Sequence, residues 1–122
     1  MNIEDKRIYG ENIITIGMFD QHTHQQEISK TDYIRIIEDT IFSFGFFGAT
    51  ILTEGIFGIF RHEDGTIVRE PSIRVEINGS TRREVLPLIR SLREKLNQES
   101  IMYRYTEQVF EFVDIEYDKE EN

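Results

Sequence analysis

Residues 72–96 read SIRVEINGSTRREVLPLIRSLREKL, and this stretch contains a strand, a turn and the start of a helix in succession. In its first six residues, isoleucine and valine alternate with serine, arginine and glutamate. This alternation predicts a strand with one apolar and one polar face. The apolar members are Ile73, Val75 and Ile77, and the turn Asn78-Gly79-Ser80 ends the strand.

A helix is expected directly after this turn. Thr81-Arg82-Arg83-Glu84 matches a capping box, in which the threonine hydroxyl and the glutamate carboxylate each accept a backbone N–H at the helix start. Pro87 conflicts with a regular first turn, so the helix either begins later than the capping box or is kinked there. Apolar residues then recur at the spacing of one helical stripe, at Val85, Ile89, Leu92 and Leu96.

Upstream of this stretch, an Asp-Gly pair predicts a hairpin. Asp64-Gly65 lies between two extended runs, residues 49–62 and 67–78, and Asp-Gly favours the tight turns that join antiparallel strands. Pro71 cannot donate a hydrogen bond to a neighbouring strand, which indicates an edge or a bulge at that point. We therefore expect one long strand, a turn and a return strand.

The N-terminal half predicts one more strand and one more helix. Residues 12–19 are rich in isoleucine and nearly continuously apolar, as expected for a central strand. A polar segment, residues 20–27, follows. Ser29 is a suitable N-cap, because its hydroxyl can accept a backbone N–H. Apolar residues at helical spacing run from Tyr33 to Phe44, which predicts an amphipathic helix.

The last strand is expected over residues 101–113. The two ends of the chain, residues 1–11 and 114–122, are polar and are expected to form a flexible arm and an acidic tail. The length of 122 residues suits a single domain, 1–122, with a core over about 12–113.

The order strand, helix, hairpin, helix, strand resembles the ferredoxin-like superfold, a βαββαβ sandwich of the α+β class. We expect a four-stranded antiparallel sheet with two helices on one face, which leaves the other face to solvent or a partner. An apolar open face favours a homo-oligomer that associates through it. Several apolar strand residues cannot all lie under the helices: Phe57, Ile59, Phe60, Tyr103 and Tyr105.

The amino-acid composition limits the classes of binding partner. The chain has 23 acidic and 14 basic residues and a formal net charge of −9, which argues against direct nucleic-acid binding because phosphate affinity comes from Lys and Arg. The charge is uneven, since residues 61–104 contain nine basic and seven acidic residues. An acidic chain with a basic middle can still offer a local anion site.

Other sequence features bear on location. There is no cysteine, which excludes disulfides and thiolate metal sites. The N-terminus lacks the basic and apolar regions of a signal peptide. The apolar segment 41–60 carries Glu54 and several glycines, so it does not read as a membrane span. We expect a cytoplasmic protein that does not contact membranes.

The first candidate site is an anion site at the start of the second helix. A glycine-containing turn before a helix presents free N–H groups and the positive end of the helix dipole. Guanidinium groups suit phosphate or carboxylate ligands. The alternative is a capped helix with solvated arginines. The candidate residues are Gly79, Ser80, Thr81, Arg82 and Arg83, with Arg74 on the preceding strand.

The second candidate is a metal site at His22 and His24. A His-x-His pair on an extended segment places both rings on one side, and Asp20 could complete a site. A polar loop with solvent-facing histidines is the alternative, which we favour. His62 lies at the hairpin, where a turn explains the residues.

No catalytic group can be named from the sequence. There is no nucleophile motif and no Ser-His-Asp arrangement, so we expect a protein that is not an enzyme and carries no cofactor. A shared-subunit active site in an oligomer stays an open alternative.

In its element order, the chain also resembles the nitrogen-regulatory signalling trimers, which bind nucleotides between subunits, although it carries none of their motifs. In length and composition it is similar to small acidic phage and mobile-element accessory proteins. These resemblances imply a non-catalytic, homo-oligomeric module for a small anionic ligand such as a nucleotide. A phage-type module could sequester a host defence signal.

The alternative is an acidic inhibitor or adaptor that binds and blocks a host protein. It would act through its acidic surface or the open sheet face. Nucleotide-dependent thermal stabilisation would favour the ligand module, and a salt-sensitive complex with a host protein would favour the inhibitor.

Overall fold

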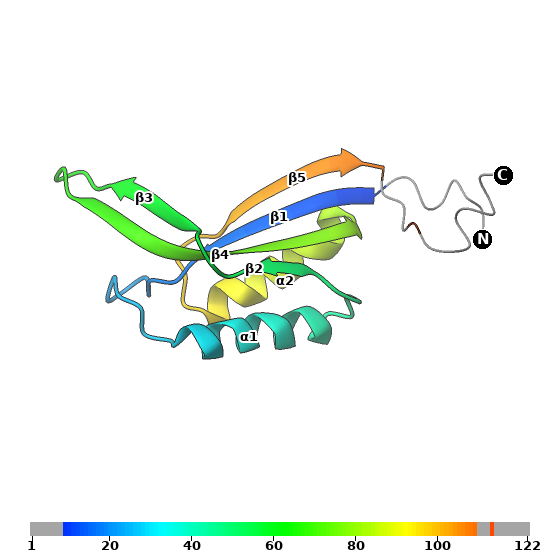
Figure 1. Ribbon diagram of the computed structural model, residues 1–122, viewed down its shortest axis with the longest axis horizontal. Helices are drawn as coiled ribbons and strands as arrows, with labels where there is room; N and C mark the ends of the chain where they lie inside the picture. Colours follow the sequence, from blue (N-terminus) through cyan, green and yellow to red (C-terminus); the bar gives the residue numbers. More distant parts are fainter. Residues whose placement is uncertain (1–8, 110–112, 114–122) are drawn as a thin grey trace.

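The computed structural model describes residues 9–109 and 113, and these form two helices and five strands (Figure 1). The acidic tail 114–122 lies outside the described residues, as do residues 1–8. Residues 9–11, which we expected in a flexible arm, instead begin the first strand. In chain order the elements are β1 (Tyr9–Gly17), α1 (Lys30–Ser43), β2 (Thr50–Leu52), β3 (Phe57–Arg61), β4 (Ile67–Ser80), α2 (Arg82–Lys95) and β5 (Met102–Gln108).

Four strands form an antiparallel sheet in the order β2-β4-β1-β5, and both helices cover the same face of it (Figure 1). The order puts the first and last strands side by side, as a ferredoxin-like sandwich requires. The predicted fold class is therefore confirmed. No helix in the described part of the chain has the length and apolar character to cross a membrane.

The prediction of a single long strand over residues 49–62 was wrong. The chain leaves the sheet after Leu52 and turns at Gly55, whose φ of 75° no continuous strand can accommodate. The chain then forms β3, which pairs only with the first part of β4, residues 67–71. The result is a fifth strand and a two-stranded arm, formed by residues 57–71, that extends beyond the helices (Figure 1).

The core lies between the sheet and the helices. Val75 of β4 pairs with Ile14 of β1, and both side chains are fully buried beneath Ile37 of α1 and Leu88 of α2. Burial of each such side chain contributes about 1.5–3 kcal/mol. The isoleucine-rich β1 is central, as predicted, because it has a paired neighbour on each side.

Both predicted helix starts are confirmed. The Ser29 hydroxyl accepts the Asp32 N–H, and Thr81 and Glu84 form a complete capping box. Helix α2 runs through Pro87, which is exposed in its second turn, so the helix does not begin later than the capping box.

One buried polar residue was not anticipated. Asn12 of β1 is fully buried, and its amide donates to the carbonyls of Ile77 and Ser80 at 3.0 and 2.8 Å. The Tyr103 hydroxyl donates in turn to the Asn12 side-chain oxygen. This network joins β1, the end of β4 and β5, and it holds the turn that precedes α2.

Candidate functional site

The turn and helix start that the sequence singled out form as expected. Gly79 has a φ of 90°, in the left-handed region that favours glycine. The Thr81 N–H donates to the Glu84 carboxylate at 3.0 Å, and the Glu84 N–H donates to the Thr81 hydroxyl at 3.2 Å. Two N–H groups that a bound anion could use are therefore already satisfied within the chain.

Arg82 and Arg83 follow directly in the first turn of α2, and both are exposed. The ion pairs formed among residues 9–109 are Lys30–Glu54 and Arg35–Asp32. Neither Arg82 nor Arg83 takes part in one, so both guanidinium groups can meet a ligand.

Arg74, the sixth candidate residue, lies away from the start of α2. It stands on the sheet face that the helices leave open, next to Thr15 of β1 and Leu52 of β2. Gly79 lies five positions further along β4, which corresponds to about 17 Å. The structure therefore groups Gly79–Arg83 at the end of the sheet and does not bring Arg74 to them within one chain.

A recess at the base of the arm was not anticipated. It has a volume of about 340 Å³, is open to solvent, and is lined by Gly55, Ile56, Phe57, Arg69 and Pro71. Phe57 is paired in register with Pro71, and Arg69 lies two residues earlier, on the same side of β4. The recess therefore combines an exposed aromatic ring with a guanidinium group beside it.

On the other side of β4, Glu70 reaches towards the end of β1. Its carboxylate accepts the Phe19 N–H at 2.7 Å and lies where a side chain at Gly17 would be, 2.4 Å from an ideal Cβ. Only glycine fits at position 17 without moving this carboxylate. A half-buried acid therefore stands at the base of the arm, near the recess but on the opposite side of the strand.

Tyr33 of α1 also contacts the end of β1, where its hydroxyl donates a hydrogen bond to the Gly17 carbonyl. Burial raises the pKa of Tyr33 well above its usual range, and the nearby Glu70 carboxylate raises it further. Tyr33 thus stays a neutral donor at any physiological pH.

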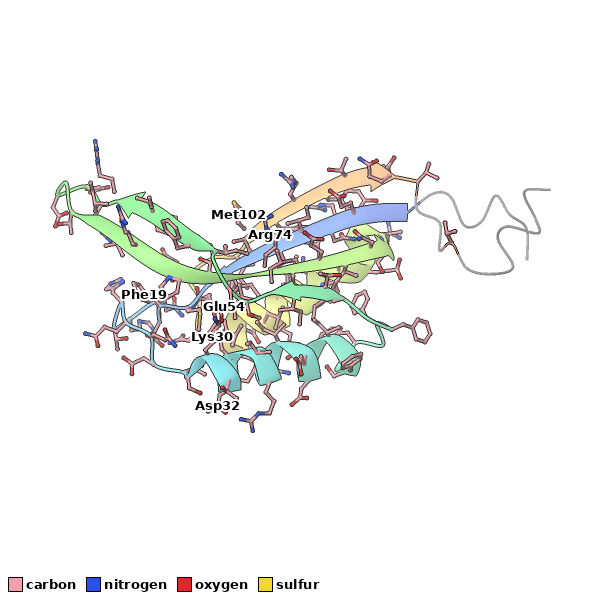
Figure 2. All side chains as sticks on the ribbon, viewed as in Figure 1. Phe19, Lys30, Asp32, Glu54, Arg74 and Met102 are labelled. Atoms are coloured by element: carbon pink, nitrogen blue, oxygen red, sulfur yellow. The ribbon has the colours of Figure 1, made fainter. Side chains whose placement is uncertain are left out.

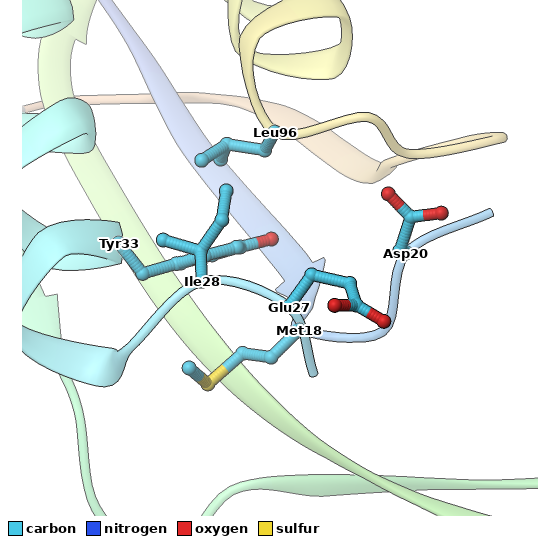
Figure 3. Close-up of a pocket in the computed structure, with 6 residues that line it drawn as sticks. All are labelled: Met18, Asp20, Glu27, Ile28, Tyr33 and Leu96. Atoms are coloured by element: carbon cyan, nitrogen blue, oxygen red, sulfur yellow. The ribbon is translucent and has the colours of Figure 1, made fainter. Parts of the chain in front are cut away.

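The space around Tyr33 is small. Figure 3 shows Ile28 and Tyr33 between Leu96 and Met18. The cavity that these residues line has a volume of about 10 Å³. This is room for about one water molecule, so the cavity is not a ligand site.

The histidines lie near the arm as well. His24 belongs to the loop after β1, and its ring centroid is 6.4 Å from that of His62 at the end of the arm. His22 and His24 are exposed. No group of three metal-binding side chains occurs among the described residues.

The recess and the Glu70 contact were not predicted, for different reasons. The recess depends on the break between β2 and β3, whereas the sequence predicts one strand over residues 49–62. The Glu70 contact depends on the register of β4 against β1, which no local pattern specifies. The pair Glu54-Gly55 within residues 49–62 was the available signal for the break, because Asp/Glu and Gly are depleted in strands.

Comparison with known proteins bears on the fold. No protein-family model matches the sequence, and no curated protein sequence matches it. Solved structures do match in three dimensions. A phage SAM lyase in complex with S-methyl-5'-thioadenosine superposes with a TM-score of 0.63 and 19% identity, over 84% of this chain and 85% of the lyase chain.

Two further structures share the fold. CutA from Synechococcus elongatus matches with a TM-score of 0.56 and 11% identity, over 84% of this chain and 79% of CutA. A nitrogen regulatory PII-like protein from Thiomonas intermedia, bound to ADP, AMP and bicarbonate, matches with a TM-score of 0.52 and 13% identity, over 88% of this chain and 96% of that protein. At these identities, the likeness establishes the ferredoxin-like fold.

Proposed function

We propose that this chain is a homo-oligomeric protein that binds an adenosine-containing small molecule at the base of the arm. The recess lined by Phe57 and Arg69 carries this proposal. An exposed aromatic ring can stack on a purine base. The guanidinium group beside it can bind a phosphate or carboxylate on the same ligand. The volume of the recess, about 340 Å³, lies in the range of small-molecule sites.

The ligands of two structural neighbours support this choice of ligand class. The phage SAM lyase binds S-methyl-5'-thioadenosine, and the PII-like protein binds ADP and AMP. These compounds share an adenosine group and differ in charge. A site that combines an aromatic surface with one cation is suited to that shared part.

The start of α2 stays a second proposed position for the anionic part of a ligand. Gly79, Ser80 and Thr81 form the turn there, and the exposed guanidinium groups of Arg82 and Arg83 form no ion pair within residues 9–109. In an oligomer, this position and the recess can come from different copies, so the two are best tested in parallel.

Thermal-shift and calorimetric titrations with S-methyl-5'-thioadenosine, S-adenosylmethionine, ADP and AMP test the proposal. We expect at least one of them to raise Tm. Phe57→Ala and Arg69→Ala should each weaken binding about tenfold or more, in line with the loss of a stacking or charged contact.

Matched controls are Phe47→Ala, at an exposed phenylalanine outside the arm, and Arg90→Ala on α2, and both should bind as the wild type does. The paired variant Arg82→Ala/Arg83→Ala reports on the start of α2. If none of the four compounds raises Tm, the proposed ligand class is wrong.

A second candidate function is cleavage of S-adenosylmethionine. The half-buried carboxylate of Glu70 favours it. This carboxylate does not line the recess and lies on the other side of β4, but its negative charge at the base of the arm can attract the positively charged end of that substrate. In this reaction the bond between sulfur and the aminobutyrate carbon breaks, and its electron pair goes to sulfur. The carbon fragment either loses a proton or closes onto its own carboxylate.

This function is tested by incubating the protein with S-adenosylmethionine and measuring the S-methyl-5'-thioadenosine released by chromatography and mass spectrometry. Glu70→Gln should lose the release but keep binding of S-methyl-5'-thioadenosine, because the product is neutral at sulfur. Release no faster than in buffer would leave binding as the function. The alternative of an acidic inhibitor depends largely on residues 114–122, which lie outside the described part of the chain.

A further inference from the structure

The open face of the sheet has a charge balance unlike that of the whole chain. Its side chains lie in register rows across β2, β4, β1 and β5. One row holds Leu52, Arg74, Thr15 and Met102, and the next holds Thr50, Glu76, Ile13 and Arg104. With Glu11 beyond them, this face carries two acidic and two basic residues, whereas the chain as a whole has a net charge of −9.

Arg74 is incompletely satisfied on this face. Its Nε atom is enclosed, and no acceptor for it exists among the described residues. Figure 2 shows Arg74 and Met102 on the side of the sheet away from the helices. An enclosed guanidinium N–H without an acceptor is costly, so a group from outside the chain that supplies an oxygen would be favoured.

We propose that a second copy of this chain covers the open sheet face and that its Glu76 accepts from Arg74. Two copies with a net charge of −9 repel each other, so they associate best where opposite charges can meet. Arg74 and Glu76 are two residues apart on one strand and point to the same side. A rotation axis between copies can therefore place each arginine opposite the other copy's glutamate.

Apolar side chains on the same face complete the contact. Leu52 and Met102 lie at the two ends of the Arg74 row, and both are exposed. Ile13 in the next row is already almost fully buried within one copy, so Leu52 and Met102 supply the apolar surface that a second copy can cover. Apolar side chains around a few charged pairs are typical of stable interfaces. The exposed residues of the arm lie outside this face and stay available to a ligand.

This inference rests on the oligomeric part of the proposed function and not on the ligand. Sedimentation equilibrium and light scattering of the full chain measure it directly. The wild type is expected to be an oligomer. Arg74→Glu should raise the dissociation constant by about 30-fold or more, because like charges would then face each other at the contact.

The charge-exchange variant Arg74→Glu/Glu76→Arg should return the dissociation constant to within about threefold of the wild type, because the pair is restored with its sign reversed. Arg90→Glu on α2 is the matched control, since it changes the net charge equally but lies away from the sheet. It should leave the mass unchanged. Far-ultraviolet circular dichroism and Tm show whether each variant is folded.

A monomeric wild type, or a folded Arg74→Glu variant with the wild-type mass, overturns the inference. Failure of the exchange variant to reassemble while it stays folded overturns the Arg74–Glu76 pairing. The ligand titrations test the ligand class independently of this interface. An oligomer that dissociates as expected but binds none of the four adenosine compounds leaves this interface standing and removes only the ligand class.

Discussion

The two halves of β4 are similar in composition and opposite in environment. Residues 73–77 alternate apolar and polar side chains under two helices, and Ile73 is fully buried. Residues 67–71 continue the same strand beyond the helices, and there Ile67 is 59% exposed. An isoleucine in a strand therefore does not by itself indicate a core position. The layer above the strand decides it.

The largest expected effect follows from this difference. Ile73→Ala removes a fully buried side chain and should lower the free energy of unfolding by about 2–5 kcal/mol. Ile67→Ala makes the same chemical change on the arm and should alter it by about 0.5 kcal/mol or less. Urea denaturation of the two variants tests this directly. Equal losses in both would mean that the arm is as well covered as the sheet.

The next largest effect on stability is expected where the two halves of β4 meet, at the contact between Glu70 and Gly17. At Gly17, a methyl group would displace the Glu70 carboxylate, which would then lose its hydrogen bond from the Phe19 N–H, so Gly17→Ala should destabilise the fold by about 1 kcal/mol. Glu70→Ala removes the obstacle together with the acceptor of the Phe19 N–H, so the double variant should be about as stable as Glu70→Ala alone. Thermal and urea unfolding of the single and double variants measure the coupling. Additive losses would show that the two residues do not touch.

A smaller effect concerns the loop after β1, which contacts the arm through Phe19 and the residues after α2 through Asp20. Asp20 accepts from the Asn97 amide at the end of α2 and from the N–H groups of His22 and Thr23. These hydrogen bonds, that to Asn97 foremost, lower the pKa of Asp20 below its usual value of 3.8. Because the folded-state pKa is the lower one, the stabilisation is present above about pH 4 and is lost as pH falls below it.

Asp20→Asn should therefore flatten the fall in stability below about pH 4 and change the stability at pH 7 only slightly, because the group is exposed. Urea denaturation at several pH values checks this. Glu27→Gln in the same loop is the control, and it should keep the wild-type pH profile. A wild-type profile in Asp20→Asn would contradict the role given to Asp20.

Much of the fold was predictable because its signals are local. The Ser29 cap, the capping box from Thr81 to Glu84 and the Asp64-Gly65 turn each involve atoms within a few residues, and all three form as expected. The element order then left few arrangements for the sheet.

The candidate site was less predictable. The start of α2 could be located, but Arg74 proved to lie on another surface, because position along a strand says little about position around the sheet. The recess beside Phe57 and the contact of Glu70 with Gly17 join segments that are far apart in the sequence.

By itself, the sequence determined the helices, the turn of the arm and the α+β order, since hydrogen bonds and side-chain periodicity within short segments specify them. Only the tertiary structure decided where the long apolar run breaks. It also decided that Asn12 is buried in a hydrogen-bond network and that half of β4 lacks a covering layer. The physical reason is that burial depends on what packs against a residue, and those partners come from distant parts of the chain.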